Sequence, residues 1–354
     1  MTRDMTDPDL SARLDLLIWA DILKSAPSGL TLTDGTRREF RGEAAWHRAL
    51  WAMVFARDLR AWGADPDRVR DSFLWDEAAR AASGALLASR PVLSAAEMRA
   101  AERIHTARDL FQALFSVTLS RAERDALRAS LSTGEAAFLA DDWPEAHVHA
   151  TGLVDRTPLG STPEFRERLA FLMEADLLKS VTRGTPLCDN SRKERSGEHS
   201  WHVSWSALLF SDYAAEPVDL SEVVAMLMIH DLVEIDAGDA PIHGDHDAAA
   251  LAIAEDRAAT RIFGLLPAPQ GAVLRALWDR FEAAESSEAV FAKALDRVHP
   301  VLCNLETGGG TWREYDVTLE QLETRVGVKV RRGAPAIWEA LRPRIEGWFA
   351  QNAL

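Results

Sequence analysis

The sequence predicts an all-α protein, on three observations. Stretches rich in Ala, Leu, Arg and Glu repeat their apolar residues with the period of a helix. Val, Ile, Thr and Tyr rarely alternate with polar residues, and no Asn-Gly pair joins two apolar runs as in a β-hairpin. Pro and Gly residues separate the helical stretches, near positions 26–27, 90–91, 216–217, 267–271 and 308–310.

The helical period is clearest in five segments that these breaks separate. Each segment is long enough for three or more turns and has an apolar face that a core can bury. We therefore expect helices, in chain order, over residues 14–25, 45–61, 95–115, 165–180 and 246–265.

Composition bounds the class of protein. The chain has 354 residues, of which 47% are hydrophobic and 27% charged, so it can bury a core, and its length fits two domains or one large one. Its net charge of −15, without a basic stripe, argues against a nucleic-acid polymer as partner. Two cysteines exclude a disulfide framework and a four-cysteine zinc site. No apolar run reaches the roughly 20 residues that span a bilayer, and the first residues lack the apolar segment of a signal peptide. We expect a soluble, cytoplasmic protein without a membrane partner.

An internal repeat sets the expected domain organisation. When the chain is shifted by 155 residues, residues 17–55 fall on residues 172–210 without a gap, and 17 of these 39 positions are identical. The alternative is that two unrelated Ala-rich helical segments resemble each other, but paired Trp-His, Gly-Glu and Asp positions favour a duplication. Thr, Gly, Pro and Ser residues break the helical pattern near 150–163. We therefore predict two tandem helical domains, residues 1–155 and residues 156–354.

The chemistry-bearing residues gather in the second predicted domain. His230 and Asp231 follow a strongly apolar segment, residues 223–229, and Glu234 lies four and three residues further on. On a helix these three side chains share one face. Burying them beside an apolar helix is costly unless a metal ion or mutual pairing compensates. By itself, a His-Asp pair is more often a structural histidine with a satisfied partner.

Two more residues complete a set that could hold a metal ion. His199 lies about thirty residues before His230, at the start of another expected helix, and Asp296 lies about sixty-five residues after it. Two imidazoles and two carboxylates suit one divalent ion, with positions open for water and substrate. These ligand types do not choose among Mn²⁺, Co²⁺, Fe²⁺, Zn²⁺ and Mg²⁺.

In these motifs the sequence resembles the HD-domain metal-dependent phosphohydrolases, and most of all the branch that contains the 5′-deoxynucleotidases. The resemblance covers about residues 163–354, and it is carried by residues 192–202, 229–239, 291–297 and 308–313. It implies an all-α fold of the HD type for both predicted domains. Family members often have Asn where this chain has Arg195, which places the contacts just before Glu198 in question.

The resemblance also implies a role for each matching residue. The metal ligands would be His199, His230, Asp231 and Asp296. Glu234 would be the catalytic acid or base, and Asp239 would be a further acidic residue near substrate and water. Arg183 would contact the phosphate, and Arg192 is a second candidate for that contact. This agrees with chemistry, because hydrolysis of a phosphate ester needs neutralised charge, an activated water and fork-like recognition of phosphoryl oxygens.

The function that the resemblance implies is hydrolysis of a small phosphorylated substrate, a nucleoside 5′-monophosphate, by water that one divalent metal ion activates. Two alternatives stay open. One is another HD-domain activity, such as a phosphodiesterase, a triphosphohydrolase or a diiron oxygenase, for which His243 and His246 could add a second metal. The other is a regulator that binds a nucleotide without turnover, although the intact Glu234 and the four ligands speak against it.

The first predicted domain lacks most of these residues. Positions 199, 230 and 234 correspond to Ala44, Trp75 and Ala79, while Asp231 corresponds to Asp76. We therefore expect residues 1–155 to be a degenerate HD-like domain that binds no metal. Because family members commonly pair, the two halves could mimic a dimer within one chain. The expected assembly is either a monomer with such paired halves or a homodimer.

Overall fold

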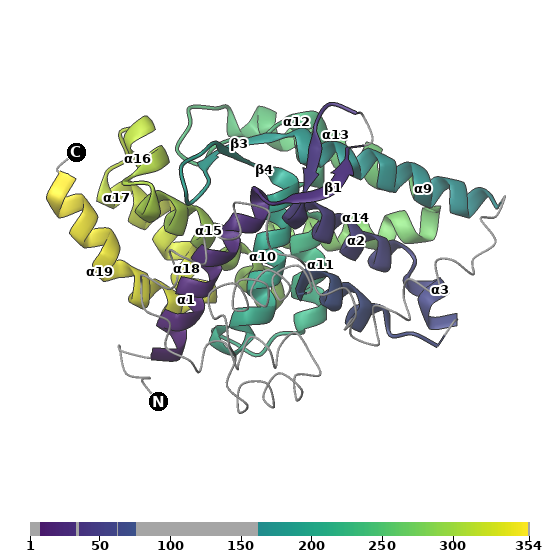
Figure 1. The fold of residues 1–354 in the computed structure, drawn as a ribbon, viewed down its shortest axis with the longest axis horizontal. Coiled ribbons are helices and arrows are strands. Elements are labelled where there is room, and N and C mark those ends of the chain that lie inside the picture. The colour runs from purple at the N-terminus through teal and green to yellow at the C-terminus, as the bar shows by residue number, and fades with distance from the viewer. Residues whose placement is uncertain (1–7, 33–34, 62, 76–161, 353–354) are drawn as a thin grey trace, which may run out of the picture. The chain divides into compact units, whose positions relative to one another are not determined.

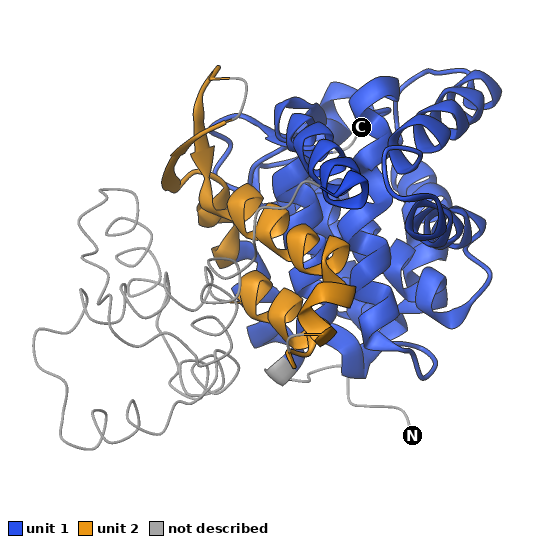
Figure 2. Cartoon of the chain, turned by 90° about the vertical axis from the view of Figure 1, so that its right-hand side faces the viewer, with its two compact units in different colours: residues 1–18, 161–354 blue, residues 19–160 orange. Residues whose placement is uncertain are grey.

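A computed structural model describes residues 8–32, 35–61, 63–75 and 162–352. The chain divides into two compact units, one made of residues 1–18 and 161–354 and the other of residues 19–160 (Figure 2). The sequence-based division at residue 155 stays a prediction. Within the described part of the chain, no helix combines the length and the apolar character that membrane crossing requires.

The described part of the second unit begins with the end of α1, which spans Pro8–Ala20, and a 3₁₀ turn, η1 (Asp21–Lys24). A two-stranded antiparallel hairpin follows, of β1 (Pro27–Thr31) and β2 (Arg38–Phe40), and then α2 (Arg41–Val54) and α3 (Ala56–Ala61). Residues 66–75 are helical as well. The helices expected over 14–25 and 45–61 are thus present, whereas the one over 95–115 lies outside the described residues.

The other unit is helical apart from one short hairpin, which confirms the predicted all-α class (Figure 1). Its first half contains α9 (Pro163–Ala175), η2 (Asp176–Ser180), β3 (Thr182–Pro186), β4 (Lys193–Arg195), α10 (Ser196–Phe210), η3 (Ser211–Tyr213), α11 (Leu220–Ile229), η4 (His230–Val233) and α12 (Glu234–Ala237). Its second half contains α13 (Ala248–Phe263), α14 (Ala268–Ala283), α15 (Ser287–Glu306), α16 (Gly310–Glu314), α17 (Leu319–Leu322), the π-helical turn η5 (Glu323–Gly327), α18 (Val328–Gly333) and α19 (Pro335–Asn352). The helices expected over 165–180 and 246–265 correspond to α9 with η2 and to α13.

Helix α10 forms the centre of this unit. All but one of its fifteen residues are buried, including polar ones such as Glu198 and His199, because α11 and α15 pack against it. At its start the Glu198 carboxylate accepts the backbone N–H of Arg195 at 2.9 Å, which satisfies a donor that the helix itself leaves unpaired. A helix buried on all sides can hold polar side chains only where they find partners, and its polar residues therefore mark a site.

The same series of elements occurs twice at the spacing of the sequence repeat. Residues 8–20 and 163–175 are helical, residues 27–31 and 182–186 form strands, and the following helices begin at Arg41 and Ser196. In each pair the second element begins 155 residues after the first. The duplication and the domain division stay predictions, because residues 76–161 lie outside the described part.

The two hairpins are the main departure from the expected elements. Each pairs strands of five and three residues across a register irregularity. β3 has the sequence Thr-Arg-Gly-Thr-Pro, which carries little β propensity and shows no alternation. These strands are therefore held by their surroundings. Gly184 packs against the loop after α12, where an added Cβ would lie 2.9 Å from Pro241 Cγ.

Candidate metal centre

The chain brings four predicted ligands together from three elements of one unit. His199 lies on α10, His230 and Asp231 lie on η4, and Asp296 lies on α15. His199 Nε2 lies 3.1 Å from Asp296 Oδ1, and His230 Nε2 lies 3.0 Å from Asp231 Oδ1 and 3.8 Å from Asp296 Oδ1. One ligand atom each from His199, His230 and Asp231 lie within 4.8 Å of one another. All four side chains are buried.

Local backbone geometry explains why η4 can present two ligands. Asp219 caps the start of α11 by accepting the N–H of Ser221 at 2.9 Å, and from Val223 α11 is apolar as far as Ile229. The backbone tightens into a 3₁₀ turn at His230–Val233 and resumes as the short α12. Gly238 ends α12 with φ of +74°, a conformation that suits glycine. The shared face expected for His230, Asp231 and Glu234 assumed an α-helix, whereas the structure has His230 and Asp231 in a 3₁₀ turn and Glu234 at the start of α12.

The outer nitrogen of each histidine is fixed by a hydrogen-bond acceptor. His199 Nδ1 donates to Glu194 at 3.1 Å, and His230 Nδ1 donates to the carbonyl oxygen of Leu227 at 2.8 Å. This arrangement turns both Nε2 atoms toward the carboxylates, as in metal sites whose histidines are oriented by a second acceptor. His230 Nε2 is buried, and although Asp231 Oδ1 lies 3.0 Å away, the two atoms are not aligned as a hydrogen bond. A buried nitrogen without an aligned hydrogen bond costs free energy unless a ligand satisfies it, so the donor set fits a divalent cation.

The charged groups of the site shift one another's pKa values. Burial alone would lower the pKa of His230, but the Asp231 and Asp296 carboxylates raise it to about 10. Burial opposes ionisation of Asp231 as well, yet His230 and Arg183 hold its pKa at about 2. Despite burial, Arg297 and the two histidines hold the pKa of Asp296 well below its ordinary value. Asp231 and Asp296 are thus held in the ionised form, which is the form that can ligate a divalent ion.

Glu234 and Asp239 lie beside the ligands and line the same cavity of about 260 Å³. Glu234 accepts a hydrogen bond from the Ser196 hydroxyl, and Arg183 Nη1 lies 3.4 Å from it. Burial and the negative charge of Asp231 raise the pKa of Glu234 well above its ordinary value. Asp239 accepts the backbone N–H of Gly184 at 2.8 Å, which ties the loop after α12 to β3.

The two predicted phosphate-binding arginines differ in position. Arg183 lines the cavity, where its Nη1 donates to Asp231 at 2.6 Å. Arg192 is not among the residues that line this cavity. Its two Nη atoms bind both oxygens of the buried Glu198 at 2.6 and 2.9 Å, and Arg37 binds Glu43 in the same way at the equivalent positions of the repeat. The structure therefore places Arg192 at the start of α10, outside the residues that line this cavity, and its contact with phosphate stays a prediction.

Sequence reasoning missed Glu194 as a site residue. Its side chain is fully buried, and besides binding His199 it lies 3.5 Å from Arg183 Nε and 3.7 Å from His299 Nε2. The signal that could have found it is its recurrence as Glu39 in the sequence repeat. It holds one proposed ligand and one arginine of the cavity in a common orientation.

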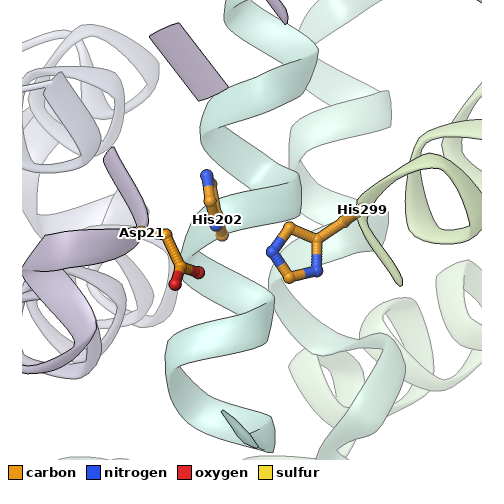
Figure 3. Close-up of side chains that lie close together, drawn as sticks. All are labelled: Asp21, His202 and His299. Carbon is orange, nitrogen blue, oxygen red and sulfur yellow. The ribbon is translucent and has the colours of Figure 1, made fainter. Parts of the chain in front are cut away.

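Two other buried histidines, His202 on α10 and His299 on α15, lie side by side (Figure 3), with ring centroids 4.5 Å apart. The His202 Nε2 donates to the carbonyl oxygen of Leu17 at 2.8 Å, which agrees with the structural role that its recurrence as His47 indicates. His243 and His246 line the cavity, but among the described residues neither belongs to a group of three ligand atoms close enough to share an ion. The geometry thus favours one metal over two.

Comparison with known proteins identifies the family. An HD domain model matches residues 175–338. A protein from Magnetospirillum magnetotacticum MS-1, described as a predicted metal-dependent phosphohydrolase, has a crystal structure that matches with a TM-score of 0.51 and 41% identity, over 54% of this chain and 95% of that one. The chain therefore belongs to the HD-domain metal-dependent phosphohydrolases, and membership implies a divalent metal ion.

Two curated relatives are more distant. The 5′-deoxynucleotidase HDDC2 of Bos taurus and that of Homo sapiens are each 28% identical to this chain over 138 residues. Each match covers 39% of this chain and 66% of the relative's length.

Proposed function

We propose that this chain is a phosphomonoesterase that releases phosphate from nucleoside 5′-monophosphates, with His199, His230, Asp231 and Asp296 holding one divalent ion. The observation that carries the proposal is the convergence of the two histidine Nε2 atoms on the Asp231 and Asp296 carboxylates, with His230 Nε2 buried and in no aligned hydrogen bond. The metal would polarise a phosphoryl oxygen and lower the pKa of water.

The remaining residues of the site have separate tasks in this proposal. Glu234 accepts a proton from the attacking water and can return it to the leaving oxygen, because it lies beside the ligands at the cavity wall. The Ser196 hydroxyl and Arg183 hold the Glu234 carboxylate from two directions. Asp239 fixes the loop that closes one side of the cavity.

The cavity supports a substrate with an apolar part next to its phosphate. Besides its carboxylates, the cavity lining includes large apolar or aromatic side chains, among them Phe281, Trp312, Tyr315 and Val326. Pockets that bind small molecules combine such walls with a few converging polar groups, and a nucleoside offers flat rings to aromatic surfaces. The match to the 5′-deoxynucleotidases also supports a nucleotide as the substrate.

A substrate panel tests this function. The full-length protein is freed of metal with a chelator, reloaded with Mn²⁺, Co²⁺, Fe²⁺, Zn²⁺ or Mg²⁺, and incubated with ribo- and deoxyribonucleoside 5′-monophosphates, 3′-monophosphates, triphosphates and phosphodiesters. We expect inorganic phosphate from the 5′-monophosphates. Turnover confined to triphosphates or diesters would instead indicate another HD-domain activity. Saturable nucleotide binding without turnover would indicate a regulator.

A further inference from the structure

A phosphate monoester brings up to two negative charges into the cavity, and it needs a cation whose charge the protein has not already neutralised. Arg183, the arginine that the family resemblance assigns to this task, already has acidic groups around it. Its guanidinium faces Asp231 at 2.6 Å, Glu234 at 3.4 Å, Glu194 at 3.5 Å and Asp239 at 3.9 Å. Four carboxylates surround one cation, so one effect of Arg183 is to hold those carboxylates in place.

Arg297 meets the need better. It follows Asp296 on α15 and lines the cavity, and 24% of its side chain is exposed. Within the described part of the chain, its one ion pair is with Asp296, at a loose 3.8 Å, and its Nε is buried without a hydrogen-bond partner. A buried guanidinium N–H without an acceptor is costly unless a ligand supplies one.

Other cations near Arg297 differ in how far they are compensated. Lys293, one turn earlier on α15, also lines the cavity, but its Nζ pairs with Glu282 at 2.8 Å. Arg325 donates to the carbonyl oxygen of Ile242 at 3.1 Å and so supports the loop after α12. The field of Arg297 also reaches Lys329, since burial, Arg297 and Lys293 together lower the pKa of that lysine. Of the two cations on α15 that line the cavity, Lys293 has an acidic partner at 2.8 Å, whereas the nearest acidic partner of Arg297 lies 3.8 Å away.

We propose that Arg297 is a second cation that binds the nonbridging phosphate oxygens of the substrate, in addition to Arg183, which also positions the Asp231, Glu234 and Asp239 carboxylates. This inference rests on the proposed phosphohydrolase function and adds the recognition element to it. The planar guanidinium offers a donor pair that matches two phosphate oxygens, and its place beside Asp296 lets one anion contact both the arginine and a metal held by the ligands.

Binding of inorganic phosphate to the full-length, Mn²⁺-loaded protein tests this proposal by isothermal titration calorimetry, without any turnover. We expect Arg297→Met to weaken phosphate binding about tenfold or more, since a hydrogen bond to a charged group is lost. Arg297→Lys keeps the positive charge but lacks the paired N–H donors of the guanidinium, so its affinity for phosphate should fall between those of the wild type and the Met variant. Metal content by mass spectrometry and the thermal transition should stay as in the wild type.

The control is Arg280→Met, which removes an exposed arginine of α14 paired with Glu222, and it should bind phosphate as the wild type does. Wild-type phosphate affinity in Arg297→Met would overturn the proposal, and so would loss of bound metal, which would assign Arg297 to holding Asp296. If the Met variant does not fold, wild-type affinity in Arg297→Lys overturns it. Because the assay needs no substrate, absence of nucleotide hydrolysis would refute the proposed function without deciding the role of Arg297.

Discussion

The Glu194 carboxylate does not line the cavity, yet three groups of the site touch it: His199, Arg183 and His299. Such contacts restrict each side chain to one orientation, which is what a metal site needs from the residues around its ligands. The sequence pattern predicts the ligands through their spacing, but a residue that acts only by holding others leaves no spacing of its own. Arg297 was missed for a related reason, because an arginine next to an aspartate on a helix is common.

Glu194→Gln is expected to weaken metal binding about tenfold to a hundredfold, because the amide accepts from His199 Nδ1 without a negative charge. Titration of the metal-free protein with Mn²⁺ against a competing chelator measures this. Glu222→Gln, which changes a carboxylate paired with the surface residue Arg280, serves as control. Equal metal affinity in both variants would show that Glu194 does not tune the site.

Glu234→Gln is expected to reduce kcat by about a hundredfold to ten-thousandfold, the usual contribution of a positioned general acid or base. Metal content should remain normal, because Glu234 is not one of the four converging ligands. Steady-state kinetics with a nucleoside 5′-monophosphate and metal analysis of the same sample test both parts. A variant that loses activity together with metal would make Glu234 a ligand.

At the level of elements, the helices could be predicted because an apolar stripe of helical period must be buried wherever the helix lies. The hairpins could not, because β3 and β4 have no alternation and are fixed by packing. Between α15 and α18 the packing is close. An added Cβ on Gly333 would lie 2.4 Å from the carbonyl oxygen of Val290 and 2.8 Å from Ala294 Cβ. α15 carries Asp296 and Arg297, so this contact also supports the site.

Gly333→Ala is therefore expected to destabilise the protein by about 1–3 kcal/mol, since α18 must move away from the α15 backbone. The matched control is Gly347→Ala in α19, where an added Cβ meets nothing within 4 Å. There the substitution should stabilise the protein by up to about 1 kcal/mol, because glycine is a poor residue inside a helix. Relative to the wild type, the urea unfolding midpoints of the two variants should shift in opposite directions. A shift of both midpoints in the same direction would contradict this account.

On the scale of the whole molecule, the ligands come from positions about a hundred residues apart, so a bound metal ion ties α10, η4 and α15 together. An ion that binds only the folded chain raises its stability by an amount that grows with concentration, about 2.7 kcal/mol at a hundred times the dissociation constant. We expect removal of metal by a chelator to lower the thermal transition and re-addition of Mn²⁺ to restore it. Asp296→Ala should abolish this dependence. If the thermal transition temperature of the wild type did not change with the Mn²⁺ concentration, this would argue against a metal ion at this site.

The repeated series of elements shows which residues serve the framework. Both copies carry a buried Lys–Asp pair, Lys24 with Asp21 and Lys179 with Asp176, and an arginine clamped to a glutamate at the start of the following helix. The two copies differ at Ala44, which stands where α10 has His199. Residues that the two repeated segments share are therefore expected to maintain the fold. Residues that occur only in the C-terminal segment, such as His199, are expected to carry the chemistry.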